Sequence, residues 1–579
     1  MLRSSALALL TTLTIAGTAS AAGDPVMGLS DVSAGMQCTG YSVVKGTAIS
    51  SFAVAVEDVV TGDAGERAPR ILVRVSGPVV DATGIGPGFS GSPIYCPDAN
   101  GVQRVIGAIS ESVGQYGNKV ALATPIEAIL GQPVEPPPAA RSAPALVRAA
   151  RPIATPLSIG GLSAPVAGVV QRAAAQAGRP VTTVPAAPRG GFAPQPLVPG
   201  AAMAVGLASG DLTAGAVGTV AYADGDRIWA FGHPLDAVGR RSLLLQDAYV
   251  YAVIDNPLST ADASTYKLAA AGHDLGTLSG DGASAVAGTL GALPARYPMR
   301  VVARDLDTGH LDVTNVQLAD ESAVGLPGGS SALSSIGPIA VSQGAFNALG
   351  SVPARQTASL CVRIEVRELR RPMRFCNSYV GPIGGGEDLA GAPMAADLGS
   401  AAELLDAYTG APLHVSAVVA DLKLRRGLRQ AFLAAVTGPQ VVRRGTTVRV
   451  RAIAQRVGGG MLSRTIRVHI PRSLRPGPRD LTLVGTPADE PAAGSGSGSV
   501  QVDLGTLLGP VATTQPGPQT PAGLAAAISQ LHRPDGVSLA FRTAGAPPPQ
   551  DPAVLGGRAV FREDGLRISG LAALRVRVE

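Results

Sequence analysis

The sequence predicts a mainly β protein built from several domains. The chain has 579 residues, which is more than one domain usually holds. Its 73 glycines and 47 prolines, against 3% aromatic residues, indicate many turns between short strands. Long stretches alternate apolar and polar residues, as strands with one buried face do. The net charge of +5 is small for this length and argues against nucleic acid as the main partner.

The N-terminal segment is typical of a secretory signal peptide. Arg3 supplies a positive start, residues 6–16 are apolar and Thr-rich, and Ala19-Ser20-Ala21 fits a small-residue cleavage site. The segment is too short for a spanning helix, and no later run is long and apolar enough to span a membrane. The mature chain is therefore expected to be extracytoplasmic, either periplasmic or secreted.

The four cysteines agree with an oxidising compartment and fall in two pairs that are local in sequence, Cys38 with Cys96 and Cys361 with Cys376. Four cysteines allow three pairings, so sequence alone does not prove the connectivity. A zinc site would want closer ligand spacing, and the chain has no CxxC motif. Two disulfides are the expectation, with no metal and no cofactor.

The first strands follow the signal segment. Apolar residues alternate with others over 52–56 and again over 71–75, a strand pattern in both cases. After a glycine-rich loop, 105–109 is a short buried strand. The stretch Thr124–Leu130 is typical of a short helix, with Thr124 as its cap and Pro125 at its first position.

The glycine-rich loop is Gly88-Phe89-Ser90-Gly91-Ser92-Pro93. Glycines on both sides of Phe89-Ser90 permit positive φ and a tight, exposed loop that a substrate backbone can approach closely. Such a loop can aim the N–H groups of Gly88 and Ser90 at one point, where they would stabilise the oxyanion of acyl transfer. The alternative is a Gly/Pro/Ser turn between two strands.

Later segments continue the β pattern, with a few helices. Residues 164–177 and 522–531 are expected helices, and Asp224-Gly225-Asp226 is a hairpin signal. The outgoing strand of that hairpin runs straight into Gly232-His233-Pro234, which places His233 at a strand end. The turn between Cys361 and Cys376 would set these cysteines opposite each other across a second hairpin, and 415–484 has the alternation of a β-sandwich.

The expected domain organisation follows these segments and their Pro/Gly-rich connections. It comprises a signal peptide at 1–21, a β-rich segment with the serine loop at 24–132, a linker with one helix at 133–200, a β-rich segment with His233 at 201–305, a β-rich extension with a disulfide hairpin at 306–400, a β-sandwich-like domain at 401–485, a linker at 486–520, and a C-terminal helix with strands at 521–579.

Taken together, the motifs resemble those of the SpoIVB serine peptidase family. They are the loop 88–93 with Ile106-Gly107-Ala108 behind it, Lys45-Gly46-Thr47-Ala48-Ile49 with Phe52, and the run from Gly218 to Pro234, and they span about half of the chain. The resemblance implies an extracytoplasmic serine endopeptidase whose trypsin-like double β-barrel is a peptidase module made of the serine-bearing segment 24–132 and the histidine-bearing segment 201–305. It would act on a protein or peptide substrate, with self-processing as a further option. The resemblance assigns the nucleophile to Ser90 and the general base to His233.

The chain departs from that family in two respects. Here the serine segment precedes the histidine segment, as in the rearranged secreted subgroup of the family; triads are defined by geometry and not by chain order. In addition, Gly77 stands where the family has its proposed acid, and no PDZ domain is recognisable. Asp236, three residues beyond His233, and Asp81, near the serine loop, are the candidate replacements. A Ser–His pair without an acid is the remaining option.

Three hypotheses on function remain open at this stage. The chain is an active serine endopeptidase, a catalytically degenerate peptidase fold that binds a peptide or cell-envelope partner, or a structural multi-domain β protein. Of the six histidines, His233 alone sits in a motif that the resemblance ties to the serine. Its alternative role is to cap a strand end.

Overall fold

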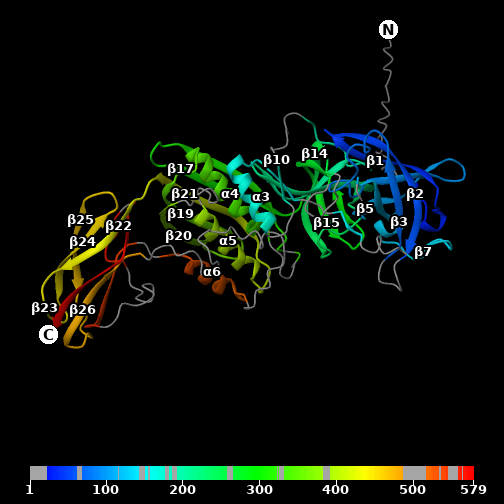
Figure 1. Ribbon diagram of the computed structural model, residues 1–579. Helices are drawn as coiled ribbons and strands as arrows, with labels where there is room; N and C mark the ends of the chain where they lie inside the picture. The colour runs from blue at the N-terminus through cyan, green and yellow to red at the C-terminus, as the bar shows by residue number, and fades with distance from the viewer. Residues whose placement is uncertain are drawn as a thin grey trace, which may run out of the picture.

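The computed structural model describes residues 23–61, 68–114, 117–142, 150–153, 157–176, 181–184, 192–256, 265–322, 324, 331–382, 392–486, 517–533, 536–545, 559–563 and 565–579. The expected signal peptide and most of the linker at 486–520 lie outside these residues. The described part of the chain is mainly β, as the sequence predicts. It runs from a barrel near the N-terminus to a two-sheet unit at the C-terminus (Figure 1).

The first unit is a closed barrel of six strands. Its pairing order is β1-β4-β5-β6-β3-β2, and β2 pairs back with β1. The expected alternation over 52–56 and 71–75 is confirmed, since Phe52, Val54, Val56, Ile71, Val73 and Val75 are all buried in the barrel. Its elements are η1 (Leu29–Asp31), β1 (Gln37–Lys45), β2 (Ala48–Thr61), β3 (Arg70–Ser76), β4 (Pro93–Pro97), β5 (Gln103–Ser112), β6 (Val120–Pro125) and α1 (Ile126–Ile129), with β7 (Arg141–Ser142) beside β2 and β8 (Arg151–Pro152) beside β5.

The short helix α1 forms where expected, but Thr124 does not cap it. Pro125 is the N-cap residue, and no side chain there accepts a hydrogen bond. The Thr124 hydroxyl lies 2.8 Å from Ser110 Oγ and donates to Gly232 O at 2.7 Å, more than a hundred residues away. The Thr124 hydroxyl therefore makes a long-range polar contact and does not form the helix cap that the local sequence predicts.

The disulfide Cys38–Cys96 joins β1 to β4 directly after the serine loop, as expected, and closes a loop with a sequence separation of 58. Replacing both cysteines by alanine is expected to lower the free energy of unfolding by about 4 kcal/mol, because the bond removes loop-closure entropy from the unfolded chain. The matched double variant at Cys361 and Cys376, with a separation of 15, should lose about 3 kcal/mol on the same basis. Urea unfolding followed by circular dichroism measures both; equal or reversed losses would contradict this account.

The second unit begins with another closed ring of six pairings, β11-β12-β13-β16-β15-β14 and back to β11. The hairpin expected at Asp224-Gly225-Asp226 joins β12 to β13. Further strands extend this sheet on both sides. Its elements are β9 (Leu157–Gly160), β10 (Val181–Val184), β11 (Ala202–Gly210), β12 (Thr213–Asp224), β13 (Arg227–Ala230), β14 (Gly239–Ile254), β15 (Tyr266–Asp281), β16 (Val286–Leu290), β17 (Arg296–Asp305), β18 (Leu311–Ala319), β19 (Arg355–Val366), β20 (Met373–Pro382) and β21 (Val415–Arg426).

Helices lie against the outer part of this sheet, between the ring and the C-terminal unit (Figure 1). They are α3 (Ala164–Gln176), α4 (Ala332–Leu349), α5 (Ala392–Asp406) and α6 (Pro521–Gln530). The sequence predicted α3 and α6 but not α4 or α5. Helix α4 is buried almost all round, so it lacks the polar stripe that reveals a surface helix, and Pro338 interrupts its helical signal. The Ser331 side chain caps it by accepting from Ser334 N–H, and Gly350 ends it at a φ of 64°.

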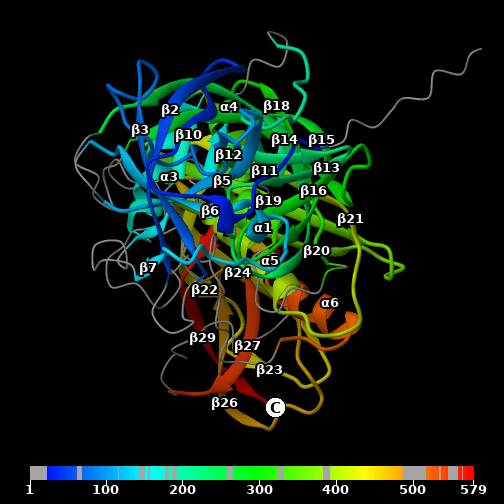
Figure 2. The ribbon, with the colours of Figure 1, turned by 90° about the vertical axis from the view of Figure 1, so that its right-hand side faces the viewer.

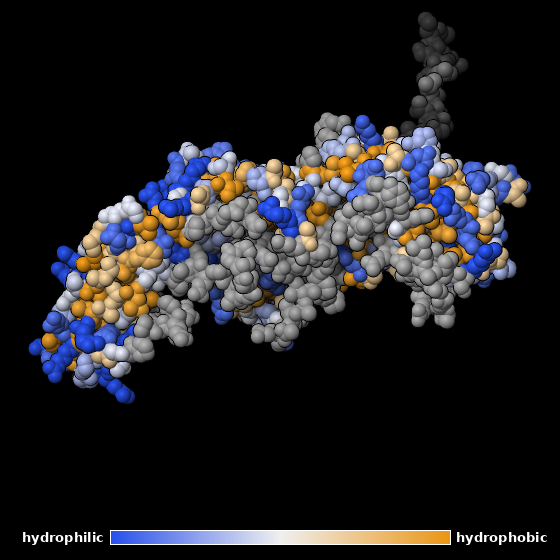
Figure 3. Space-filling model, viewed as in Figure 1, coloured by the Kyte–Doolittle hydropathy of each residue, from blue (hydrophilic) through white to orange (hydrophobic). Residues whose placement is uncertain are grey.

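The C-terminal unit consists of two four-stranded sheets around one apolar core, and it projects away from the rings (Figure 2). Its strands are β22 (Gln430–Thr437), β23 (Val441–Val442), β24 (Thr447–Arg456), β25 (Met461–His469), β26 (Gly477–Val484), β27 (Ser538–Thr543), β28 (Arg567–Ser569) and β29 (Leu571–Val578). Hydrophilic residues gather at its far end (Figure 3).

The boundaries of this unit differ from the expected ones. Strand β21, which was expected to start the sandwich, pairs with β17 and β19 of the large sheet instead. Helix α5 crosses the expected boundary between residues 400 and 401. The sandwich is completed by strands from the last forty or so residues.

The hairpin β19–β20 places Cys361 opposite Cys376, where the second expected disulfide forms. The helices of the described residues include no candidate membrane span.

Candidate active site at the junction of the two rings

The serine loop connects β3 to β4 and lies between the two rings. Gly88 and Gly91 have φ values of 94° and 92°, which side chains rarely adopt, so both glycines are required by the backbone. A Cβ atom on Gly91 would lie 1.9 Å from Thr219 O and 2.7 Å from Phe231 N. The loop is thus pressed against β12 and the end of β13, and Ser90 is 0% exposed. The expected tight conformation is present, but the loop is buried and not exposed.

The backbone donors of this loop fall into two groups. Phe89 N–H donates to Gly86 O, Gly91 N–H to Ile109 O, and Ser92 N–H to Phe89 O, each at 2.8–2.9 Å. The N–H groups of Gly88 and Ser90 have no acceptor among the described residues. Buried backbone donors are almost always paired, so two unpaired donors on residues 88 and 90 of one loop are unusual. They are the two donors that the sequence proposes for an oxyanion hole.

His233 lies just beyond β13, after a strained turn. Phe231 has a φ of 70°, and Gly232 N–H donates to Ala230 O at 2.9 Å, which is the rare, positive-φ form of the γ-turn. A non-glycine residue held in this conformation stores about 1–3 kcal/mol of strain, and such residues cluster at functional sites. The turn swings His233 into the junction, where it is 4% exposed and stacks on the Phe231 ring.

The hydrogen bonding of His233 selects one tautomer. Its Nδ1 lies 2.7 Å from Pro234 O, and since a carbonyl can only accept, the proton is on Nδ1. Nε2 of the neutral ring then carries the free lone pair, as a general base requires. Burial lowers the pKa of His233 below its usual value, although the backbone of Pro234 and Ile153 and the charges of Glu111 and Asp281 oppose this effect. The Ile153 backbone lies near the ring without forming a hydrogen bond of good geometry to Nε2. The ring is therefore neutral at pH 7.

The serine loop and the histidine turn pack against the same short segment of β5. Gly91 N–H donates to Ile109 O, while a Cβ atom on Gly232 would lie 3.4 Å from the carbonyl oxygens of both Ala108 and Ile109. Ser90 Oγ and His233 Nε2 are buried and have no hydrogen-bond partner among the described residues. No hydrogen bond joins them to each other. The chain thus brings the two loops together and leaves the reactive atom of each unpaired.

Neither acid proposed from the sequence accompanies His233. Asp81 accepts a hydrogen bond from Lys119 Nζ at 2.9 Å, and its side chain is 52% exposed. That bond lowers the pKa of the Asp81 carboxyl. Asp236 accepts from Arg241 at 2.7 Å, and its side chain is 50% exposed. Both carboxylates therefore serve surface ion pairs, and the group that orients the imidazole is the carbonyl of Pro234.

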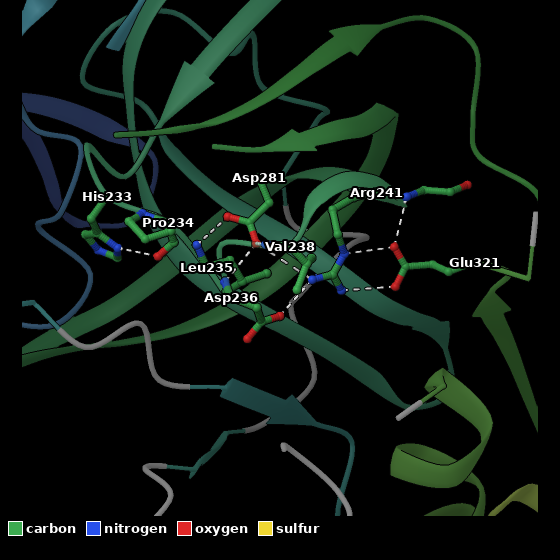
Figure 4. A network of polar contacts seen from close by, with 9 residues as sticks. His233, Pro234, Leu235, Asp236, Val238, Arg241, Asp281 and Glu321 are labelled. Carbon is green, nitrogen blue, oxygen red and sulfur yellow. Dashed lines mark hydrogen bonds and ion pairs between the residues drawn. The ribbon is translucent and has the colours of Figure 1, made fainter. Parts of the chain in front are cut away.

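A different carboxylate, Asp281 at the end of β15, holds the loop that follows His233 (Figure 4). Asp281 is 1% exposed and accepts from the N–H groups of Leu235 and Asp236 at 2.7 and 2.8 Å. The Arg241 guanidinium lies 3.9 Å from the Asp281 carboxylate and forms an ion pair with Glu321 at 2.9 Å. Sequence reasoning missed this residue because it stands between two glycines, Gly280 and Gly282, where an aspartate is ordinarily a turn residue.

A second histidine, His273, also faces a buried carboxylate. Its Nδ1 lies 3.0 Å from Asp247 Oδ2, and its ring packs edge-on against Phe192. Asp247 also accepts from the N–H groups of Gln195 and His273 itself, so it ties a loop to the sheet. Within the described ranges no serine hydroxyl is bonded to this pair, and no three His, Cys, Asp or Glu side chains there gather to hold a metal. The Ser90–His233 junction remains the candidate site.

Comparison of the chain with models of protein families, with characterised proteins and with solved structures gave no match. The assignment of a function therefore rests on the residues and on their geometry.

Proposed function

We propose that this chain is an exported serine endopeptidase of the SpoIVB type, with Ser90 as its nucleophile and His233 as its general base. The observation that carries the proposal is the set of unpaired buried polar groups at one junction: Ser90 Oγ, His233 Nε2 and the N–H groups of Gly88 and Ser90. A buried polar atom without a partner costs about 1–3 kcal/mol. Four such groups in one place are readily explained if a substrate completes them.

The chemistry follows from those groups. Ser90 Oγ attacks the scissile carbonyl carbon while its proton passes to His233 Nε2, and the carbonyl oxygen becomes an oxyanion. The N–H groups of Gly88 and Ser90 stabilise that oxyanion. The intermediate then expels the amine, which takes the proton from the imidazolium, and water releases the acyl group from Ser90 by the same steps in reverse. Pro234 O keeps the proton on Nδ1 throughout.

Substrate binding has to bring the two side chains into contact, because no hydrogen bond joins them here. Catalytic hydrogen bonds of unliganded enzymes are often long and tighten in the Michaelis complex. The two adjoining rings of six paired strands support the trypsin-like double barrel that the resemblance implies, with the site at their junction. The two disulfides support an extracytoplasmic location.

A second candidate function is a peptide-binding module without catalysis. Two observations favour it. Ser90 is fully buried, and no carboxylate among the described residues is hydrogen-bonded to His233. In that case the free N–H groups would bind a peptide carbonyl that is never cleaved.

Labelling with a fluorophosphonate probe separates the two functions. The wild-type chain is expected to be labelled at Ser90, with mass spectrometry locating the adduct, and Ser90→Ala is expected to abolish the labelling. Ser76→Ala, which removes an exposed hydroxyl at the end of β3, is the control for another serine of the same barrel and should still be labelled at Ser90. A folded wild-type chain that takes up no probe, or a Ser90→Ala variant labelled as fast as wild type, would overturn the peptidase proposal.

A further inference from the structure

Lys267 is a buried charged residue that the proposed chemistry does not use. It lies near the start of β15, is 2% exposed, and its N–H donates to Pro87 O at 2.9 Å. Its side chain passes beneath Gly88, where a Cβ atom would come within 2.8 Å of Lys267 Cβ. The amine ends 4.5 Å from the centre of the Phe89 ring. Lys267 therefore contacts the serine loop along its whole side chain.

The partners of the amine are hydroxyl groups from both rings. Lys267 Nζ donates to Ser42 Oγ of β1 at 2.7 Å and to Thr219 Oγ1 of β12 at 3.1 Å. Burial lowers the pKa of the Lys267 amine to about 7, and no charged group contributes to that shift. A lysine buried without a carboxylate is costly, so a function for it is expected.

Both hydroxyls lead on to the carbonyls of the serine loop. Thr219 Oγ1 donates to Gly88 O at 2.9 Å. Ser42 Oγ lies 2.9 Å from Ser92 Oγ, and Ser92 Oγ donates to Phe89 O at 2.6 Å. The amine thus reaches two successive carbonyls through two arms, one through Thr219 and one through Ser42 and Ser92.

The next carbonyl, that of Ser90, is also held from the same side, because Thr219 N–H donates to it at 2.9 Å. The carbonyls of Gly88, Phe89 and Ser90 are therefore all bonded, while the N–H groups of Gly88 and Ser90 find no acceptor in the part of the chain that the structure describes. A peptide plane whose carbonyl is fixed has its N–H direction constrained on the next residue. Fixing Phe89 O in this way fixes the direction of Ser90 N–H.

We infer that Lys267, acting through Ser42, Ser92 and Thr219, is a positioning residue that holds the serine loop in the conformation of an oxyanion hole. The inference rests on the proposed peptidase function. Among the described residues Lys267 makes no hydrogen bond to Ser90 Oγ, and it acts through the loop backbone. It also joins the two rings, since Ser42 belongs to one and Lys267 to the other.

The test is the rate of fluorophosphonate labelling of the full chain, resolved into its maximal rate constant and the half-saturating probe concentration. Lys267→Met keeps the length of the side chain and removes its donors. The maximal rate constant is expected to fall about 10²-fold, as for the loss of one oxyanion donor. The half-saturating concentration should stay within roughly twofold, because ground-state binding is unchanged.

Matched variants keep the test decisive if Lys267→Met does not fold. Thr219→Val breaks one arm and should lower the maximal rate constant, whereas Thr219→Ser keeps the hydroxyl and should restore it. Ser158→Ala removes another buried hydroxyl, which donates to Ala269 O on the same strand as Lys267, and should leave labelling at the wild-type rate. Such a contrast is not expected from a general loss of stability.

The possible outcomes separate the two proposals. If wild type is labelled at Ser90 and folded Lys267→Met or Thr219→Val is labelled equally fast, the positioning role is overturned and the peptidase proposal stands. If Thr219→Ser is as slow as Thr219→Val, the hydroxyl arm is likewise excluded. If the wild-type chain takes up no probe, the peptidase proposal fails, and the inference that rests on it fails too.

Discussion

His233→Gln is expected to lower the rate of Ser90 phosphonylation by about 10²–10⁴-fold, the range that a positioned general base contributes. Glutamine approximates the size of the imidazole but cannot accept and carry the serine proton. The effect should fall on the maximal rate constant, because the oxyanion donors of the serine loop are untouched. His469→Gln is the control, because His469 is exposed on β25 of the C-terminal sandwich. This variant should be labelled at Ser90 at the wild-type rate.

The pH dependence of labelling gives an independent measure of the same residue. Burial lowers the pKa of His233, and a base works only when it is unprotonated. The labelling rate of wild type should therefore fall as pH drops, with its midpoint below the ordinary histidine value of about 6.5. The folded chain should also lose stability as pH falls below about 6.5, the histidine pKa of the unfolded chain, because the unfolded chain then takes up a proton that the buried ring does not. The loss is complete once the pH reaches the lower pKa of the folded state. A His233→Gln variant that keeps the wild-type acid limb would remove His233 from the mechanism.

The positions of the serine and histidine loops could be predicted because their signals are local. Glycines around Phe89-Ser90 and the strand that ends at Gly232-His233 are readable from neighbouring residues. The burial of the loop could not be predicted in this way. It depends on the close approach of Gly91 to Thr219 and Phe231, a contact between the two rings.

The residues that support the site could not be predicted either, because their contacts also join distant parts of the chain. Lys267 stands on β15 in phase with buried Ala269, so only the knowledge that this strand faces the other ring would reveal a buried amine. Asp281 accepts hydrogen bonds from backbone N–H groups that lie more than forty residues earlier in the chain. Helix α4 was missed because its burial on all sides removes the amphipathic pattern. In each case the decisive partner is distant in sequence.

The carboxylate of Asp281 is expected to matter more for the site than either acid proposed from the sequence. Asp281→Ala leaves the N–H groups of Leu235 and Asp236 without acceptors in a buried position and removes a charge near Arg241. Breaking one side of a buried ionic network costs about 3–5 kcal/mol. The loop beyond His233 would also lose its anchor, so the labelling rate of Ser90 should fall with the free energy of unfolding.

Urea unfolding followed by tryptophan fluorescence measures the free energy of unfolding of the ring that carries the His233 turn. The chain has one tryptophan, Trp229, which lies on β13 directly before the His233 turn. Asp236→Ala is the matched control, because it removes an exposed partner of the same Arg241 and should cost at most about 1 kcal/mol. If the two variants unfold at the same urea concentration, or if folded Asp281→Ala is labelled at the wild-type rate, Asp281 does not position the histidine loop. A large loss for Asp281→Ala alone would show that a buried carboxylate from β15 anchors the turn that carries the base, and Pro234 O links that turn to the imidazole.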